Sequence, residues 1–522
     1  MACDKTDSEL RNDGVHPELF HVSPEMLEAM REARESQVAS QPSQQPRCSD
    51  EQSNFRPYDQ EQRFFVEVSR RDFFDGAHPA HIIDRVVESL DLGEIYEDYS
   101  HEGNPAYHPM MMLKVLFYAY YIGVMSSRTI WDCVINRADF IYLAAGQVPN
   151  FRTINAFRLR HLSKLGSLFT QIVLLCTRLG MVGFEHLAID GQKIQANASF
   201  TRSKNLSSLN KEYEKIKRGL EKVLEREVNE QTREKRDQRA AKLEKKLEQL
   251  DEFRKTLETL EDPEKRVNMT DSDAPTMTHK GGMARPSYNH QSAVDDRYGV
   301  TTAVRTSQHG DHGDDLFEIT DAAKVNGGSG HAVVSADCAF CNYEMLERIE
   351  QRSESFYVPD RLFEKSQEDE KRKRRFGTED FICDEHGEYH CPAGHPMRYV
   401  AVYSGPKGQP LARYKGTGCL ECELKPRCTK AAFRDLNVDS REPYRRKMRE
   451  KLQTDEGREI YMKRQAIVER GHGDDQHNRK WRQHHLRGLE KARAEFALIR
   501  IVSNIAKIIR FKPTEFLALQ LT

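Results

Sequence analysis

Two aspartates follow short apolar runs that have the pattern of buried strands. Asp190 closes the run 186–189, and Asp337 closes the run 332–336. A carboxylate at the end of a buried strand needs hydrogen bonds or a cation, because burying an unpaired charge is costly. Two such strand ends lying side by side would form an all-oxygen site of the kind that Mg²⁺ prefers. Taken singly, each aspartate is more simply explained as the cap of a following helix or turn.

A third acid, Glu469, ends a segment with a helical pattern. On a helix this residue would lie, with some drift, on roughly the same side as Tyr461, Arg464 and Val468. Three carboxylates can hold two divalent ions about 3.5–4 Å apart, which activate the attacking water or 3′-hydroxyl and stabilise the leaving 3′-oxygen of a phosphodiester. Arg464 could bind a phosphate through two parallel hydrogen bonds. The three acids therefore predict a phosphoryl-transfer site, with carboxylates that converge within about 10 Å.

These motifs, taken in order, resemble those of the DDE transposases of bacterial insertion sequences. The first-acid motif of that family, Asp-Gly with a basic residue soon after and then Ala-Asn-Ala-Ser, is similar to residues 190–199. Its second-acid motif is similar to residues 336–340, and its Tyr-Asn-x-Gln-x-Ala-Val-Asp hairpin is similar to residues 288–295. The family's Tyr-x-x-Arg…Glu signature is similar to Tyr461, Arg464 and Glu469. The resemblance covers about Phe64 to Ile509.

The resemblance implies a fold, an activity and partners. The expected fold is α/β, with an RNase H-like mixed sheet and flanking helices after an all-α N-terminal domain. The expected enzyme is a DNA transposase that cuts at the terminal repeats of its element and joins the 3′-hydroxyl ends to target DNA. Asp190, Asp337 and Glu469 would ligate Mg²⁺ or Mn²⁺, while Tyr461 and Arg464 would position DNA or support the helix. Double-stranded DNA is the expected partner, bound by a homodimer.

The segment after Glu469 departs from the family pattern. The family has an aromatic-glycine pair there and, further along, a lysine; here His472 takes the aromatic position and Gln476 takes that of the lysine. Arg479 or Lys480 is the candidate for the missing phosphate contact. One alternative is therefore a catalytically inactive protein of transposase descent that still binds DNA. A zinc-stabilised coiled-coil scaffold is a third reading, but it would not need aspartates at strand ends.

Composition and pattern divide the chain into five parts. Residues 1–60 are polar and rich in Gln, Ser and Glu, which predicts a disordered tail. We expect a helical DNA-binding domain at 61–183, the first part of the catalytic core at 184–365, a cysteine-rich insertion at 366–440 and the C-terminal helices of the core at 441–522. Within the core, apolar residues three and four apart at 203–262 predict an antiparallel coiled-coil insertion.

The helical part contains the candidate DNA contacts. Short helices with Arg, Asn and His near their starts fit a helix-turn-helix-like DNA reader, and a plain helical bundle with a basic face fits equally well. Arg152, Arg158 and Arg160 are the candidate phosphate contacts in this part. Lys193, close to the first acid, and Lys480 are the candidates in the catalytic core.

Five of the 11 cysteines fall between Cys383 and Cys428. In a cytosolic chain such clustering indicates a metal site more than disulfides. We predict that Cys391, Cys419, Cys422 and Cys428 bind a structural Zn²⁺, since four thiolates meet its tetrahedral requirement. Reduced, partly buried thiols without metal are the alternative, and Cys383 and His386 lie close enough in sequence to enter the ligand set.

Net charge gives no indication of a nucleic-acid partner, because Lys plus Arg total 80 and Asp plus Glu total 82. The N-terminal residues lack the apolar segment of a secretory signal. The expected location is thus the bacterial cytoplasm, at the nucleoid. The most apolar stretch, 109–125, contains Lys114 and is too short to span a membrane, so it predicts a buried core helix.

Overall fold

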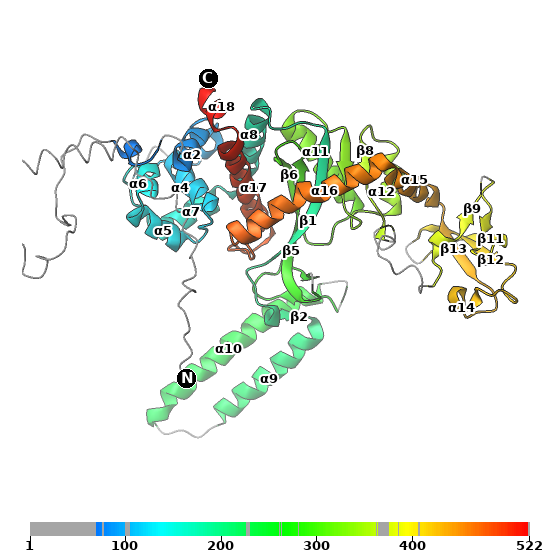
Figure 1. Cartoon of the computed structure of the whole chain (residues 1–522). Coiled ribbons are helices and arrows are strands. Elements are labelled where there is room, and N and C mark those ends of the chain that lie inside the picture. Colours follow the sequence, from blue (N-terminus) through cyan, green and yellow to red (C-terminus); the bar gives the residue numbers. More distant parts are fainter. Residues whose placement is uncertain are drawn as a thin grey trace, which may run out of the picture. The chain divides into compact units, whose positions relative to one another are not determined.

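The computed structural model describes residues 69–75, 78–99, 105–225, 230–259, 262, 264–279, 281–361, 363, 375–384, 386–405 and 408–519. The predicted disordered tail, 1–60, lies outside the described residues. The chain forms two compact units, one of residues 1–164 and 505–522 and one of residues 165–504 (Figure 1). The first unit therefore ends earlier than the predicted boundary at 183, and a C-terminal segment belongs to it.

The first unit is helical. Its elements are η2 (Arg70–Phe73), α2 (Pro79–Glu88), α3 (Gly93–Tyr96), α4 (Pro109–Tyr121), α5 (Ser127–Asn136), α6 (Ala138–Leu143), α7 (Phe151–Arg160), η3 (Leu162–Lys164) and α18 (Pro513–Ala518). Helix α4 is the apolar segment predicted as a core helix, and most of its side chains are buried. In the described part of the chain, no helix combines the length and the apolar character needed to cross a membrane.

The second unit is built on a six-stranded mixed sheet. Its strands are β1 (His186–Gln195), β4 (Thr276–Thr278), β5 (Ala284–Asp295), β6 (Thr301–Ser307), β7 (Val333–Ser335) and β8 (Ser355–Tyr357). Strand β5 pairs antiparallel with β1 on one side and with β4 and β6 on the other. Strands β1, β7 and β8 are parallel neighbours. The turn at 296–299 joins β5 to β6, directly after the hairpin motif at residues 288–295.

Strand β1 corrects one expectation about the first acid. Asp190 does not end its strand; it is the fifth of ten residues, and the strand continues to Gln195. Residues beyond it still pair with β5, with Gly191 opposite Gln291 and Gln195 opposite Ser287. The apolar run ends at Asp190 because the second half of β1 is more polar and partly exposed, not because the hydrogen-bonded ladder stops there.

Helices cover both faces of the sheet. Leu187 and Ile189 of β1 belong to a buried cluster with Leu316 and Phe317 of α11 (Gly313–Gly327). Side chains alternate along a strand, so Ala188 and Asp190 face the other way, toward the side where α16 (Asp455–Gly473) crosses the sheet (Figure 1). The remaining helices of this core are α8 (Leu165–Arg178), α12 (Tyr343–Ile349) and α15 (Glu442–Gln453), together with the part of α17 (Leu489–Phe511) that precedes residue 505.

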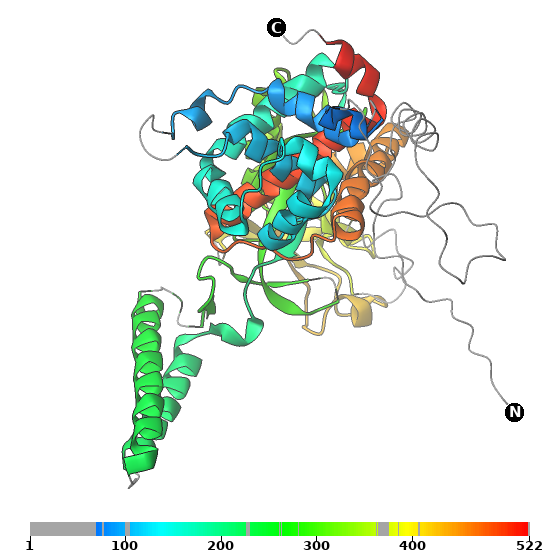
Figure 2. The same cartoon turned by 90° about the vertical axis from the view of Figure 1, so that its left-hand side faces the viewer.

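A helical hairpin leaves the sheet after β1. It consists of α9 (Leu206–Leu224) and α10 (Glu230–Glu258), which lie side by side in both views (Figure 1, Figure 2). Leu209 and Ile216 of the first helix pack with Leu250 and Leu257 of the second. The short elements η4 (Phe200–Arg202), β2 (Ser203–Lys204) and β3 (Val267–Asn268) form its base. The structure thus contains the two long helices that the apolar spacing predicts.

The cysteine-rich segment forms two small sheets. Its elements are η6 (Thr378–Asp380), β9 (Ile382–Cys383), β10 (Tyr389–His390), β11 (Met397–Ser404), β12 (Pro410–Gly416), α14 (Lys425–Cys428) and β13 (Asp435–Asp439). Strands β9 and β10 pair with each other, and β11, β12 and β13 form the second sheet. Their shared core is a cluster of six buried residues, one of which is Cys428. A core this small gives the segment little hydrophobic stabilisation of its own.

Candidate functional site

Strand register brings the two aspartates together. In the parallel pairing of β1 with β7, the last paired residues are Ala188 and Ser335. Asp190 and Asp337 each follow two residues later, so they lie at the same level of these two neighbouring strands. Helix α16 packs against both strands and closes this side of the sheet.

The electrostatics show that this is a crowded acidic site. Burial, together with the negative charges of Asp190 and Asp311, raises the pKa of Asp337 to about 7, while Arg464 opposes the shift. Burial also raises the pKa of Asp311, against hydrogen bonds from Gln291 and Asn289, and Asp190 adds to the rise. Like charges this close disfavour full ionisation of the group. A cation at this point would relieve that repulsion.

Arg464 is the basic side chain that faces the aspartates from α16. Its Nη1 lies 3.6 Å from Oδ1 of Asp190, and its guanidinium lies over the ring of Tyr461, 5.3 Å from the ring centroid. The side chain is largely buried, and Nε and Nη1 have no hydrogen-bond acceptor among the described residues. Its charge therefore partly neutralises the site, while its hydrogen-bonding capacity there is unused.

Glu469 lies on the same helix but has an exposed side chain. Gln465 donates a hydrogen bond from Nε2 to Oε1 of Glu469, at 2.7 Å. Five residues along an α-helix correspond to a rotation of about 140° beyond one full turn, so Glu469 and Arg464 point in different directions. Val468 is the buried residue that faces inward at this level. Convergence of Glu469 with the two aspartates stays a prediction.

The segment after Glu469 contains a π-helix at Asp474–Asn478. Such turns are rare and are frequent at functional sites. Of the two candidates for a phosphate contact, Arg479 is buried and forms an ion pair with Asp474 at 3.0 Å. Lys480 is exposed and has a left-handed backbone, with φ of 55°. Lys480 is therefore the side chain available to a ligand.

The three arginines of α7 have different environments. Arg152 and Arg160 are exposed. Arg158 is buried, and its guanidinium donates hydrogen bonds to the hydroxyl of Tyr120, the carbonyl of Met125 and Oδ1 of Asn155. These bonds give Arg158 a structural role, so its guanidinium is not available as the phosphate contact that the sequence predicted. The helical spacing alone did not separate it from its neighbours.

The same surface of the helical unit carries residues that the sequence analysis missed. The guanidinium of Arg128 lies 5.4 Å from the ring centroid of Phe151, and that of Arg152 lies 5.8 Å from the same ring. Trp131 contacts Phe151 as well and is 36% exposed. Basic and aromatic groups gathered in this way suit a nucleic-acid backbone and its bases. The aromatic contacts between α5 and α7 could not be predicted from the amino-acid sequence.

Asp311 and Lys193 flank the first acid. Asp311 lies in the loop between β6 and α11, and a Cβ atom at Gly191 would overlap both of its carboxylate oxygens. Lys193 is exposed and donates a hydrogen bond from Nζ to the carbonyl of Thr278, at 2.9 Å. The sequence analysis missed Asp311 because it follows no apolar run, and the only signal was the glycine beside Asp190.

One cavity in the cysteine-rich segment is lined by Cys391, Cys419, Cys422 and Cys428. Burial raises the pKa of the Cys428 thiol, and the other three cysteines add to the shift. The backbone N–H of Arg434 donates a hydrogen bond to Sγ of Cys419 at 3.4 Å. Cys383 and His386 do not line the cavity; His395 does, and the sequence analysis missed it.

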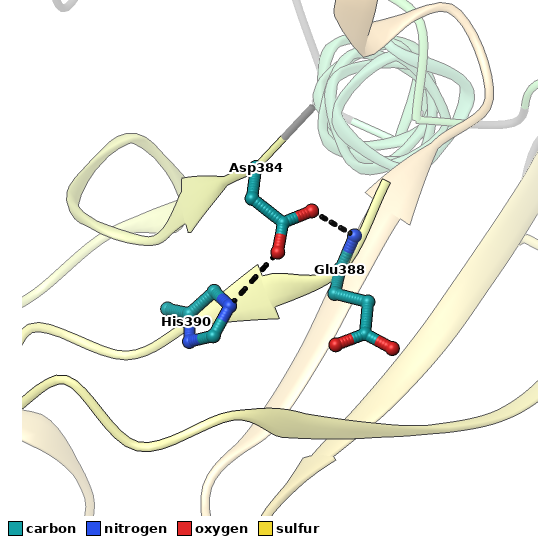
Figure 3. A group of neighbouring side chains, drawn as sticks. All are labelled: Asp384, Glu388 and His390. Carbon is teal, nitrogen blue, oxygen red and sulfur yellow. Dashed lines mark hydrogen bonds and ion pairs between the residues drawn. The ribbon is translucent and has the colours of Figure 1, made fainter. Parts of the chain in front are cut away.

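A second group of polar side chains closes the β9–β10 hairpin (Figure 3). Ligand-type atoms of Asp384, Glu388 and His390 lie within 4.8 Å of one another, a spacing compatible with a metal ion. Oδ1 of Asp384 already accepts hydrogen bonds from the backbone N–H groups of His386 and Glu388, and Oδ2 lies 3.1 Å from Nε2 of His390. The needs of the hairpin turn account for this arrangement without a metal.

Comparison with known families gives two matches. Residues 390–509 match the family described as a transposase DDE domain, and residues 68–160 match the family described as a transposase domain. Searches of curated proteins and of solved structures found no significant match. The two matches, in this order in one chain, support a DDE transposase of the kind carried by insertion sequences. The first match includes Tyr461, Arg464 and Glu469; the two aspartates lie outside it.

The raised pKa of Asp337 predicts how stability depends on pH without added Mg²⁺ or Mn²⁺. The folded state keeps this proton up to about pH 7, whereas an unfolded aspartate loses it near pH 4. Stability should therefore fall as pH rises through this window. Asp337→Asn removes the charge, so the variant should be more stable than wild type at pH 8, by at most about 4 kcal/mol at about 1.4 kcal/mol per pKa unit.

The measurement is urea unfolding of both proteins at pH 4 and pH 8. Asp314→Asn, which changes an exposed aspartate at the start of α11, serves as the control and should show no such gain. An Asp337→Asn variant with the same advantage at both pH values would contradict the assignment.

Proposed function

We propose that this transposase is a divalent-metal-dependent enzyme that cuts DNA at the terminal repeats of its insertion sequence and joins the 3′-hydroxyl ends to target DNA. Asp190, Asp337 and Glu469 are the proposed acidic residues. The observation that carries the proposal is the placement of Asp190 and Asp337 at one level of the neighbouring parallel strands β1 and β7, where both are partly buried and their charges interact. No local pattern would produce this pairing between residues so distant in sequence.

The strand order supports an RNase H-like core. The order is β6-β5-β1-β7-β8, with the first three strands antiparallel and the last three parallel. In this arrangement the first acid lies on the central strand and the second follows the adjacent parallel strand. We propose that α9 with α10, and the cysteine-rich segment, are insertions into this core.

The residues present fit Mg²⁺ or Mn²⁺. The donor set at the site is all carboxylate oxygen, which these hard cations prefer, and the mutual repulsion of Asp337, Asp190 and Asp311 calls for positive charge. When bound, the ions lower the pKa of the attacking oxygen and stabilise the leaving 3′-oxygen. Arg464, with unused donors at the site, would orient a phosphate oxygen. Tyr461 packs beneath Arg464 and would hold it in place.

The proposed DNA surface of the helical unit consists of Arg128, Trp131, Arg152 and Arg160. In the catalytic unit the proposed contacts are Lys193, which is exposed and acts on Asp311, and the exposed Lys480. Contacts to phosphate supply most of the affinity for DNA and make it dependent on salt. A homodimer on DNA would pair the two ends of the element.

Asp337→Asn keeps the shape of the side chain and removes a charge that divalent ions require. We expect the variant to lose strand cleavage and strand transfer by about a thousandfold or more, while its affinity for terminal-repeat DNA stays within about twofold to threefold, because phosphate contacts lie elsewhere. Cleavage and gel shift should be measured on the same DNA, with Mg²⁺ and with Mn²⁺. Asp314→Asn is the matched control and should cut normally.

Retained cleavage in Asp337→Asn would show that the site is misassigned. A wild-type protein that binds the repeats but never cuts them with either metal would favour the inactive, DNA-binding alternative. The exposed position of Glu469 and the substituted residues His472 and Gln476 would then be the first features to test as the cause of the missing activity.

Replacing Arg152 and Arg160 with glutamine should have the opposite effect. Affinity for terminal-repeat DNA should fall, and the slope of log affinity against log salt should become shallower by about one per phosphate contact removed. The acidic site stays intact, so cleavage at saturating protein should be retained. Titrations at several salt concentrations test this; an unchanged slope would exclude these two residues as phosphate contacts.

We propose that the cysteine-rich segment binds one structural Zn²⁺ through Cys391, Cys419, Cys422 and Cys428. The support is that all four line one cavity and that tetrahedral sites with four thiolates are typical of structural zinc. Elemental analysis of the purified chain should give about one zinc per molecule, and Cys422→Ser should lose it together with the stability of the segment.

Cys383→Ser is the matched control, because Cys383 lies in the same segment but outside the cavity. This variant should keep its zinc. Equal zinc content in Cys422→Ser and Cys383→Ser, or well under one zinc per molecule in wild type, would contradict the proposed zinc site.

A further inference from the structure

The third expected acid and the π-helix are neighbours in the same helical segment. Glu469 is exposed on α16, and the π-helix Asp474–Asn478 directly follows that helix. A π-turn closes hydrogen bonds from residue i to i+5, so it holds one residue more than an α-turn. The backbone N–H of Arg479 accordingly donates to the carbonyl of Asp474, five residues back, at 3.0 Å. The segment therefore contains one extra residue just after Glu469.

Contacts before and after Glu469 fix the two ends of this segment. Ile460 and Tyr461, in the first half of α16, pack against the large buried cluster of the second unit. Beyond the π-helix, Trp481 is fully buried and stacks on Phe496 of α17, with ring centroids 5.9 Å apart. With both ends held, the extra residue can change its position only along the helix between them.

A π-turn placed before Glu469 would change which side chain faces the sheet. In the observed register Val468, four residues after Arg464, is 3% exposed and faces inward. In a π-turn that begins at Arg464, residue i+5 takes the place that residue i+4 has in an α-helix. Glu469 would then occupy the place of Val468. The chain before Arg464 and after the present π-helix would stay where it is, because each register contains one π-turn.

The place of Val468 is close to buried donors that have no acceptor. Side chains four residues apart on a helix have Cβ atoms about 5–6 Å apart, so a carboxylate there would lie beside Arg464. Nε and Nη1 of Arg464 have no acceptor among the described residues, and Nη1 lies 3.6 Å from Oδ1 of Asp190. Gln192 shares the face of β1 with Asp190; it is 6% exposed, and its Nε2 likewise finds no acceptor in the described part of the chain. Because buried donors nearly always have partners, this face lacks an acceptor in the observed register.

A buried ion pair stabilises the π-helix in its present place. Asp475, inside the π-helix, is fully buried and forms an ion pair with Arg500 of α17, which is 1% exposed. Gly471 lies against the same guanidinium, since a Cβ atom there would be 3.4 Å from Nη1 of Arg500. Without a cation, moving the carboxylate of Glu469 inward would bury it close to Asp190, which is costly. The observed register is therefore the favoured one when no ion is bound.

We propose that α16 has two registers, and that a divalent cation at Asp190 and Asp337 favours the one in which the π-turn lies at 464–469 and Glu469 replaces Val468. Asp475 and Arg500 are the positioning residues that stabilise the observed, outer register. This proposal rests on the proposed metal-dependent function and deepens it, because it gives the exposed third acid a route into the site. The cation shifts the equilibrium because it binds the inner register, with its third carboxylate, more tightly.

The first test uses Val468→Cys, whose thiol reports the register without DNA or cleavage. In the outer register this thiol is buried and should react slowly with a maleimide; in the inner register it moves into the π-turn and becomes exposed. We expect saturating Mn²⁺ to raise its labelling rate about tenfold or more, measured by mass spectrometry of the labelled peptide. The double variant Val468→Cys/Glu469→Gln should show no such rise. Val502→Cys, at a fully buried position of α17, is the control for general loosening and should stay protected.

The second test fixes each register by removing one residue. Removal of Val468 places Glu469 four residues after Arg464 and leaves four residues for the present π-turn, which becomes an α-turn. Removal of Gln476 also converts the π-turn to an α-turn but leaves Glu469 outside, so it is the matched control. Mn²⁺ affinity, from the loss of the free-ion EPR signal, should be at least about tenfold higher without Val468 than without Gln476. Adding Glu469→Gln should abolish that advantage and leave the control unchanged.

The outcomes separate the register change from the proposed function. If wild type binds Mn²⁺ and cuts DNA while the thiol of Val468→Cys stays protected, the register change is overturned and the proposed function stands. If Mn²⁺ exposes this thiol through Glu469 but wild type never cuts DNA, the register change stands and the transposition activity does not. A wild-type protein that binds no Mn²⁺ and cuts nothing would overturn both. Circular dichroism checks the folding of the deletion variants, and if either fails to fold, the labelling result decides.

Discussion

Repulsion among partly buried carboxylates is the constraint on which the catalytic unit depends. The pairing of β1 with β7 fixes Asp190 beside Asp337, and the loop before α11 adds Asp311. Folding would not gather these groups for stability, because each carboxylate makes its neighbours harder to ionise. The surrounding structure holds them in place: hydrophobic packing of α11 under the sheet and of α16 across it fixes the strands, and Arg464 relieves part of the charge. Such a cluster persists where ligand binding needs it.

Pattern reasoning located the acids where burial produced a clear signal. Val333 to Ser335 is a parallel strand, and such strands are apolar throughout, so Asp337 stands out at its end. The same rule failed for β1, because its second half lies at a partly exposed part of the sheet and has a polar composition. Asp311 could not be found at all, since its meaning comes from Gly191 and Asn289, which are neighbours only through strand pairing.

Helical periodicity likewise identified faces but not environments. Arg152, Arg158 and Arg160 looked alike in sequence. Arg158, however, donates hydrogen bonds to the hydroxyl of Tyr120 and the carbonyl of Met125 and so stabilises the interior of the helical unit. The cysteine spacing predicted four residues that line one cavity. The histidine beside them could not be predicted, because it depends on the fold of the β10–β11 connection, where His395 lies.

The helical unit is discontinuous: residues 505–522 belong with residues 1–164, and the catalytic unit lies between them in sequence. Phe516 of α18 is buried, and this helix contacts α2. Chains fold progressively as they leave the ribosome, N-terminal parts first. Part of the apolar surface of the N-terminal helices therefore stays uncovered until the catalytic unit and then α18 have been translated. A nascent chain stalled within the second unit would carry an incomplete helical unit, so this unit becomes fully formed only after the second unit has been made.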